Sequence, residues 1–156
     1  IPETTGTIPG NARQKADYVL EHYQHDCFSE DTGLEVTALD GRPGVDTAFY
    51  AGPARDAVAN MEKVLAELAA HEDRSARFRT VITLHLEGEV HTFEGIVNGT
   101  IATERSGAEG FGYDPIFIPE GHQTTFAEMD RAAKNAISHR GRAIAKLQAF
   151  LQARKS

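Results

Sequence analysis

The segment FRTVITLHLEGEVHTFEGIV, residues 78–97, decides the fold of this chain. Residues 78–86 are rich in β-branched side chains, which favour an extended backbone. The EGE tripeptide at 87–89 follows as a turn signal, and residues 90–97 then predict a second strand. The two halves therefore predict a β-hairpin, and residues 100–102 are expected to form a further short strand.

Helical periodicity lies on both sides of this hairpin. Residues 11–23 and 56–70 place apolar side chains on one face, and Gly10-Asn11 is expected to cap the first of these helices. A last helix is expected to begin near Ser138. With no linker or repeat to divide it, the chain is expected to be one domain over residues 1–156, with an α/β or α+β layered fold.

Composition and charge limit the classes of partner. The 156 residues are 40% hydrophobic and 25% charged, a globular composition. No apolar run could span a bilayer, no secretory signal is visible, and Cys27 is the only cysteine, so a soluble cytoplasmic domain is expected. Acidic residues outnumber basic ones, 23 to 16, and the formal charge is -7. That charge argues against a nucleic-acid partner but permits a small phosphate ligand.

A polar motif with two adjacent acids, Glu30 and Asp31, is expected to form a turn over residues 29–33 between two short strands. Carboxylates in a turn can hold a hard cation such as Mg²⁺, which prefers oxygen ligands. The alternative is a solvated acidic turn without a ligand, which is the commoner role of such a pair.

Two later segments could bind an aromatic or anionic ligand. Residues 110–115, GFGYDP, place glycines around aromatic rings, so that the backbone can approach a flat ligand and a ring can stack on a base. The alternative is a tight turn whose aromatic residues belong to the core. Residues 134–140, KNAISHR, gather three potential donors at the start of the last helix, where the dipole favours anions. The alternative there is a capping segment with ordinary surface cations.

Together, these segments resemble the house-cleaning nucleoside triphosphate pyrophosphatases that hydrolyse ITP, dITP and XTP. In chain order, the matching stretches are Glu30-Asp31-Thr32-Gly33-Leu34, Pro43-Gly44 with Tyr50-Ala51-Gly52, Phe111-Gly112-Tyr113-Asp114-Pro115, Thr125-Phe126-Ala127-Glu128-Met129, and Lys134-Asn135 with Ser138-His139-Arg140. Each stretch alone is a modest signal, whereas all of them in this order are highly specific. The resemblance runs from Ile1 to the C-terminal helix.

The resemblance implies an elongated, two-lobed α/β domain with a twisted mixed sheet flanked by helices, an active-site cleft between the lobes, and a homodimer. It implies a Mg²⁺-dependent reaction in which a nucleoside triphosphate and water give the monophosphate and pyrophosphate. Glu3 and Asp31 correspond to the metal-binding positions, and Asp31 also corresponds to the base that activates the water. The positions expected to contact the substrate are Lys15, Thr32, Phe111, Gly112, Tyr113, Asp114, Lys134, His139 and Arg140.

The donors at residues 134–140 also suggest how a base would be selected. A 6-oxo purine offers an acceptor where adenine offers an amino donor, so a pocket of donors would leave groups unpaired against adenine. Two departures leave alternatives open: the family's first strand and phosphate-binding loop have no match in this sequence, and Phe49 stands where many members carry Arg. The alternatives are a pyrophosphatase for other modified nucleotides and a nucleotide-binding protein without activity.

Overall fold

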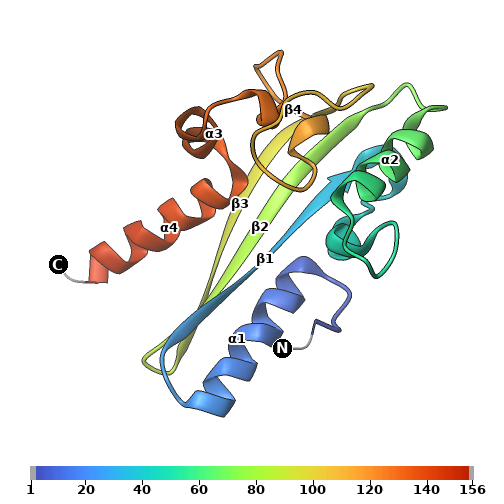
Figure 1. Ribbon diagram of the computed structural model, residues 1–156. Helices are drawn as coiled ribbons and strands as arrows, with labels where there is room; N and C mark the ends of the chain where they lie inside the picture. The colour runs from blue at the N-terminus through green and yellow to red at the C-terminus, as the bar shows by residue number, and fades with distance from the viewer. Residues whose placement is uncertain (1–2, 155–156) are drawn as a thin grey trace.

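The computed structural model describes residues 3–154, and the first two and last two residues of the chain lie outside the described part. Its longer elements are, in chain order, α1 (Ile8–Tyr23), β1 (Cys27–Val36), α2 (Ala57–Leu68), β2 (Ser75–Leu86), β3 (Glu89–Ile101), β4 (Phe117–Pro119), α3 (Arg131–Ile137) and α4 (His139–Arg154) (Figure 1). Short 3₁₀ helices of three to six residues occur between them. No helix within residues 3–154 is long and apolar enough to cross a bilayer.

The predicted hairpin is confirmed as β2 and β3, which pair antiparallel from Ser75↔Thr100 to Leu86↔Glu89. Its two-residue turn, Glu87-Gly88, has both residues at positive φ, 52° and 81°. That geometry matches the right-handed twist of paired strands. The separate strand predicted at residues 100–102 is wrong, because β3 continues without interruption to Ile101. The length of this hairpin gives the molecule its elongated shape (Figure 1).

Within residues 3–154, the sheet has the strand order β1-β2-β3-β4, which places β1 at one edge of the described sheet. The predicted α/β layered class is confirmed by these strands and the helices packed on them. Every pairing among the described residues is antiparallel, so the part of the sheet seen in residues 3–154 is not the mixed sheet that we expected.

Helices cover opposite faces of the long strands, as the alternation of side chains along β2 requires. Val81 packs with Ile8 and Ala12 of α1. The next residue, Ile82, points to the other face and packs with Ala143 and Leu147 of α4. In Figure 1, α1 accordingly lies on one side of the strands and α4 on the other.

The first helix begins earlier than its periodicity predicts. Its N-cap is Thr7, whose side-chain oxygen accepts a hydrogen bond from the Gly10 amide at 3.0 Å, and Pro9 occupies the first turn, where it is well tolerated. The predicted cap at Gly10-Asn11 is therefore wrong, and Asn11 lies inside the helix, 3% exposed. The helix predicted over residues 56–70 is confirmed as α2, capped by Asp56.

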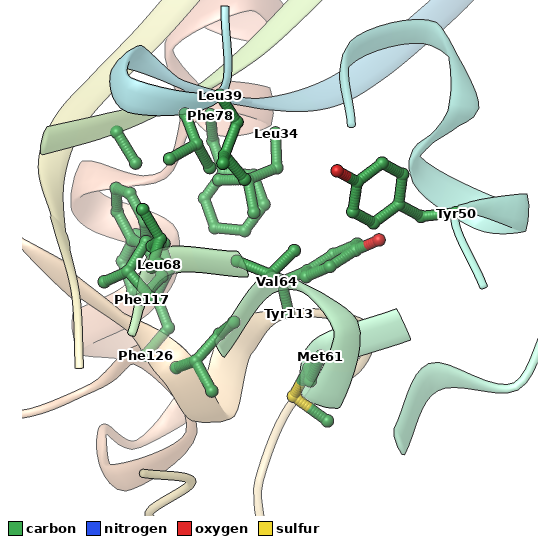
Figure 2. Close-up of a cluster of buried hydrophobic side chains, with 14 of the residues drawn as sticks. Leu34, Leu39, Tyr50, Met61, Val64, Leu68, Phe78, Tyr113, Phe117 and Phe126 are labelled. Atoms are coloured by element: carbon green, nitrogen blue, oxygen red, sulfur yellow. The ribbon is translucent and has the colours of Figure 1, made fainter. Parts of the chain in front are cut away.

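The main core lies at the end of the sheet that α2 covers. Side chains of α2 meet aromatic rings from the strands and from the later loops (Figure 2). Phe78 of β2 is at the centre of this aromatic group, with its ring centre 4.6 Å from that of Phe117 and 6.0 Å from that of Phe126. Fully buried aromatic and aliphatic side chains of this kind supply most of the stabilisation of a domain. This core therefore holds Phe78 rigidly, and Phe78 also supports the candidate site.

Candidate active site

The acidic motif does not form the predicted turn. Residues 29–33 lie inside β1, paired with the central strand β2, and the two predicted short strands are one strand of ten residues. Gly33 permits this path, because a Cβ there would lie 2.6 Å from the Gly44 carbonyl oxygen and 2.7 Å from a methyl of Ile8. The polar motif is thus displayed on an edge strand backed by a rigid sheet, which is a more precise support than a loop.

Successive side chains of a strand point to opposite faces, so neighbouring residues of the acidic motif lie on opposite faces of the sheet. Asp31 lies opposite Val81, on the face that α1 covers. Thr32 and Glu30 lie opposite Thr80 and Ile82 of β2, on the face that α4 covers. A ligand bound at the edge of β1 could therefore touch groups on both faces of the sheet.

On the α1 face, the structure brings together three of the predicted residues. The Lys15 ammonium lies 2.7 Å from Glu3 Oε1 and 3.4 Å from Asp31 Oδ1. The side chain of Asp31 is 12% exposed, and its other oxygen, Oδ2, is buried with no hydrogen-bond partner among the described residues. Burial raises the pKa of the Asp31 carboxyl, and the Lys15 ammonium opposes that rise.

The segment that carries Glu3 is fastened to α1 by two side chains that the sequence analysis did not single out. The Gln14 amide oxygen accepts a hydrogen bond from the Thr4 amide at 2.8 Å. Asn11 Oδ1 accepts from the Thr5 amide at 3.1 Å and from its hydroxyl at 2.8 Å. These bonds hold Glu3 beside Lys15. The only sequence signal for them was two amide side chains at a helix start, which is weak.

The donor set on this face suits a small divalent cation. Mg²⁺ is usually bound through one or two carboxylates together with water and substrate phosphates, and Glu3 and Asp31 both face one ammonium group. Oδ2 of Asp31 is a buried carboxylate oxygen without a hydrogen-bond partner among the described residues, so it could serve as a metal ligand. No cluster of three or more His, Cys, Asp or Glu side chains within residues 3–154 is arranged to enclose a metal by itself. The site therefore fits a cation that is held partly by a bound phosphate.

On the α4 face, the first turn of α4 reaches across the sheet. Ser138 caps this helix, as predicted, since its hydroxyl accepts from the Gly141 amide at 3.0 Å. A Cβ at Gly95 of β3 would lie 1.9 Å from the His139 carbonyl oxygen, so only glycine allows the helix so close. Arg140 then extends to the edge strand, where its Nη2 lies 2.9 Å from Glu30 Oε1.

His139 is held as a neutral imidazole. Its ring stacks on Phe78, with centres 4.6 Å apart and planes inclined by 15°. Burial, with help from the charges of Lys134 and Arg140, lowers the pKa of His139 to about 4. Its Nδ1 is buried and has no hydrogen-bond partner among the described residues. At neutral pH the ring therefore offers one donor and one acceptor instead of a charge.

The lowered pKa of His139 predicts how the stability of the protein depends on pH. The unfolded chain binds a proton at His139 more tightly than the native protein does, so the free energy of unfolding should fall as pH drops from 6.5 to about 4. The part due to His139 is on the order of 3 kcal/mol. Urea unfolding between pH 7 and pH 4 should therefore show a shallower loss for His139→Gln than for the wild type. His122→Gln, an exposed histidine, is the control and should keep the wild-type slope. Equal slopes in all three proteins would contradict the assignment.

The loop at residues 110–115 supports an exposed ring. Phe111 is 75% exposed, and its amide donates to Asp114 Oδ2 at 3.0 Å. The same oxygen accepts from the Lys134 ammonium at 2.5 Å, and that ammonium lies 4.6 Å from the centre of the Phe111 ring. Gly110, at φ 75°, gives the chain room to turn close to the Asp114 carboxylate. Asp114 therefore holds both the ring and the cation in place.

A pocket of about 360 Å³ lies beside this ring and is lined by the loop and by α3. Its lining residues are Ala108, Glu109, Gly110, Phe111, Phe126, Met129, Arg131, Lys134 and Asn135. The short helix α3, which the sequence analysis missed, carries three of these residues. Phe111 and Lys134 are the two predicted substrate contacts that line this pocket.

The other predicted contacts differ in accessibility. Gly112, at φ 60°, continues the loop. Tyr113 is 4% exposed and donates from its hydroxyl to the Thr47 carbonyl at 2.6 Å. Desolvation raises its pKa, so the hydroxyl stays protonated. Tyr113 and the similarly buried Asp114 thus form the inner side of the loop, where they support the exposed residues that a ligand could touch.

Comparison with known proteins places these features in context. The sequence model of the Ham1 family matches residues 1–150. A dITP/XTP pyrophosphatase of Flavobacterium johnsoniae is 53% identical over 155 residues, which cover 99% of this chain and 81% of that relative. One from Porphyromonas gingivalis is 53% identical over 152 residues, covering 97% and 78%. The solved Ham1 protein of Staphylococcus aureus superposes with a TM-score of 0.96 at 40% identity, covering 99% of this chain and 81% of that one.

Proposed function

This chain belongs to the Ham1 family, and we propose that it hydrolyses dITP, XTP and ITP to the nucleoside monophosphate and pyrophosphate, which cleanses the nucleotide pool. The observation that carries the proposal is the division of the motif on β1. A largely buried carboxylate with an unpartnered oxygen lies beside Lys15 on one face, and the exposed Phe111 ring with the Lys134 ammonium lies on the other. A nucleotide across this edge would place its phosphates at the first group and its base at the second.

In the proposed reaction, Asp31 is the general base. It accepts a proton from a water molecule, the water oxygen forms a bond to the α-phosphorus, and the bond from that phosphorus to the bridging oxygen of the β-phosphate breaks. Pyrophosphate leaves, and the monophosphate stays behind. Lys15 lies within reach of Asp31 and offers a positive charge to the phosphate oxygens.

We propose Mg²⁺ as the cofactor, with Glu3 and the free oxygen of Asp31 as its protein ligands. When bound, Mg²⁺ neutralises charge on the phosphates and fixes their position. The formal charge of -7 permits this arrangement, in which a divalent cation bridges the carboxylates and the phosphates. It also supports a small nucleotide as the ligand in preference to a nucleic acid. A cytoplasmic homodimer is part of the same proposal, on the ground of the family resemblance.

Base selection would follow from the donors at the second group. The Lys134 ammonium and the neutral His139 ring offer N–H groups to the 6-oxygen of hypoxanthine or xanthine. Adenine presents an amino group at that position and would leave these donors unpaired, which is costly in a desolvated pocket. The exposed face of Phe111 can stack on the purine ring.

Pyrophosphate release by the wild-type protein tests the proposal directly. With Mg²⁺ present, kcat/KM for dITP and XTP should exceed that for dATP by at least about a hundredfold, and a chelator should abolish release. A preference for pyrimidine or methylated nucleotides would favour the pyrophosphatase of other modified nucleotides. Calorimetric binding of dITP without any release would favour the inactive binding protein. Release of orthophosphate in place of pyrophosphate would contradict the reaction itself.

A further inference from the structure

Two threonine hydroxyls form a pair on the α4 face of the sheet. Thr32 of the edge strand and Thr80 of β2 are register partners, and their hydroxyl oxygens are 2.8 Å apart. Thr80 is 0% exposed, whereas Thr32 is exposed. A ligand could therefore contact the Thr32 hydroxyl but not the Thr80 hydroxyl.

The difference in burial decides the direction of the hydrogen bond. Within the described chain, the Thr80 hydroxyl makes its side-chain hydrogen bond to Thr32. If Thr32 donated the proton, the Thr80 proton would be buried without an acceptor, which native proteins avoid. If Thr80 donates, its proton is satisfied, and the Thr32 proton is left on the exposed side of the strand. The second arrangement is favoured, and it turns Thr32 into an outward donor.

The surroundings of Thr32 place that donor inside the proposed site. On one side, the neighbouring row of the sheet carries Phe78, on which His139 stacks. On the other side, the next row carries Glu30, which the first turn of α4 reaches through Arg140. The Thr32 hydroxyl therefore lies between the Phe78–His139 stack and the Glu30–Arg140 ion pair, both of which are on the α4 face.

We infer that Thr80 is a positioning residue, which holds the Thr32 hydroxyl as a donor to an acceptor oxygen of the bound nucleotide. Thr80 itself touches no substrate. The inference rests on the proposed function, because it assigns a role within the same site. The inference predicts that the atom of the nucleotide facing Thr32, where the nucleotide crosses β1, is a hydrogen-bond acceptor and not a donor.

The test compares Thr80→Val, which removes the hydroxyl at nearly constant size, with Thr80→Ser, which keeps it. With dITP, Thr80→Val should raise KM about three- to tenfold, the range that one neutral hydrogen bond is worth, with kcat changed less than about twofold. Thr80→Ser should stay within about twofold of the wild type. Thr83→Val is the matched control, since Thr83 is 1% exposed on the same strand but faces α1, and it should leave KM unchanged.

A double-mutant cycle separates positioning from a packing effect. In a Thr32→Val background, Thr80→Val should have no further effect on KM, because the donor it positions is already gone. An equal rise in KM in both backgrounds, or an unchanged KM in Thr80→Val alone, would overturn the inference. Loss of folded protein would lower apparent kcat and the melting temperature without moving KM, so it cannot imitate the expected result.

Failure of the proposed function would look different. A wild-type protein that releases no pyrophosphate from dITP or XTP overturns the proposed function. In that case, the calorimetric Kd for dITP replaces KM in the same cycle. Coupling between Thr32 and Thr80 in that Kd would still support the positioning role, and its absence would overturn it.

Discussion

Replacing Asp31 by Asn is expected to lower kcat for dITP by at least about a hundredfold while leaving the fold intact. The amide is nearly the same size and can still face Lys15, but it cannot accept a proton from water. It also removes the free carboxylate oxygen that we propose as a ligand of Mg²⁺. Pyrophosphate release at saturating dITP and Mg²⁺ measures kcat. A variant that kept more than about a tenth of the wild-type kcat would show that Asp31 is not the base, since that loss is under 1.4 kcal/mol.

The same substitution should not lower stability at neutral pH. Because burial raises the pKa of Asp31, the native protein binds its proton more tightly than the unfolded chain does. Stability from this group therefore rises as pH falls through its folded pKa, and the ionised form is unfavourable above it. Asp31→Asn should melt at or above the wild-type temperature at pH 7. Glu30→Gln is the matched control for the kinetic test of Asp31→Asn. This neighbouring acid lies on the α4 face and pairs with Arg140, so its removal should affect KM more than kcat.

The hairpin and the helix over residues 57–68 could be predicted because their signals are local. β-Branched residues followed by a Glu-Gly turn specify the pairing of β2 and β3, and an aspartate cap with apolar residues at helical spacing specifies α2. The short helix α3 could not be predicted in this way. It has seven residues, none of them fully buried, so it carries no clear amphipathic pattern.

The acidic motif shows where local reasoning failed. Polar residues and Gly33 indicate a turn when they are considered alone. Pairing with the buried strand β2 overrides that preference, because the long-range contact satisfies the backbone of β1. Once the segment is known to be a strand, the separation of Asp31 from Thr32 follows from the two-residue period. The role of Thr80 could not be found before the register between these strands was known.

The grouping of Glu3, Lys15 and Asp31 came from the family resemblance and not from spacing. These residues lie on three separate segments, and nothing local links them. The structure adds the free oxygen of Asp31 and the bonds that hold the segment of Glu3 to α1. For Asp114, it adds a supporting role that the motif alone did not reveal, since that carboxylate holds Lys134 and Phe111 together.

That supporting role makes the second large prediction. Lys134 and Asp114 form an ion pair whose side chains are 13% and 4% exposed. Lys134→Ala would leave the Asp114 carboxylate buried with the Phe111 amide as its remaining donor. Removing one partner of a buried pair typically costs about 3–5 kcal/mol, so urea unfolding should show a loss of that size. The control is Arg154→Ala, which breaks a similarly short pair with Glu87 whose side chains are 33% and 69% exposed, and it should cost about 1 kcal/mol or less.

A double variant identifies the cause of the loss. Lys134→Ala combined with Asp114→Asn removes both charges, and the asparagine amide oxygen can still accept from the Phe111 amide. If the uncompensated charge is what destabilises Lys134→Ala, the double variant should regain at least about half of the lost free energy. It should not regain binding of dITP, because the donor to the base is still missing and KM should stay high. Recovery of stability without recovery of KM would separate the two roles of Lys134. A double variant no more stable than Lys134→Ala alone would show instead that the uncompensated charge of Asp114 is not the cause of the loss.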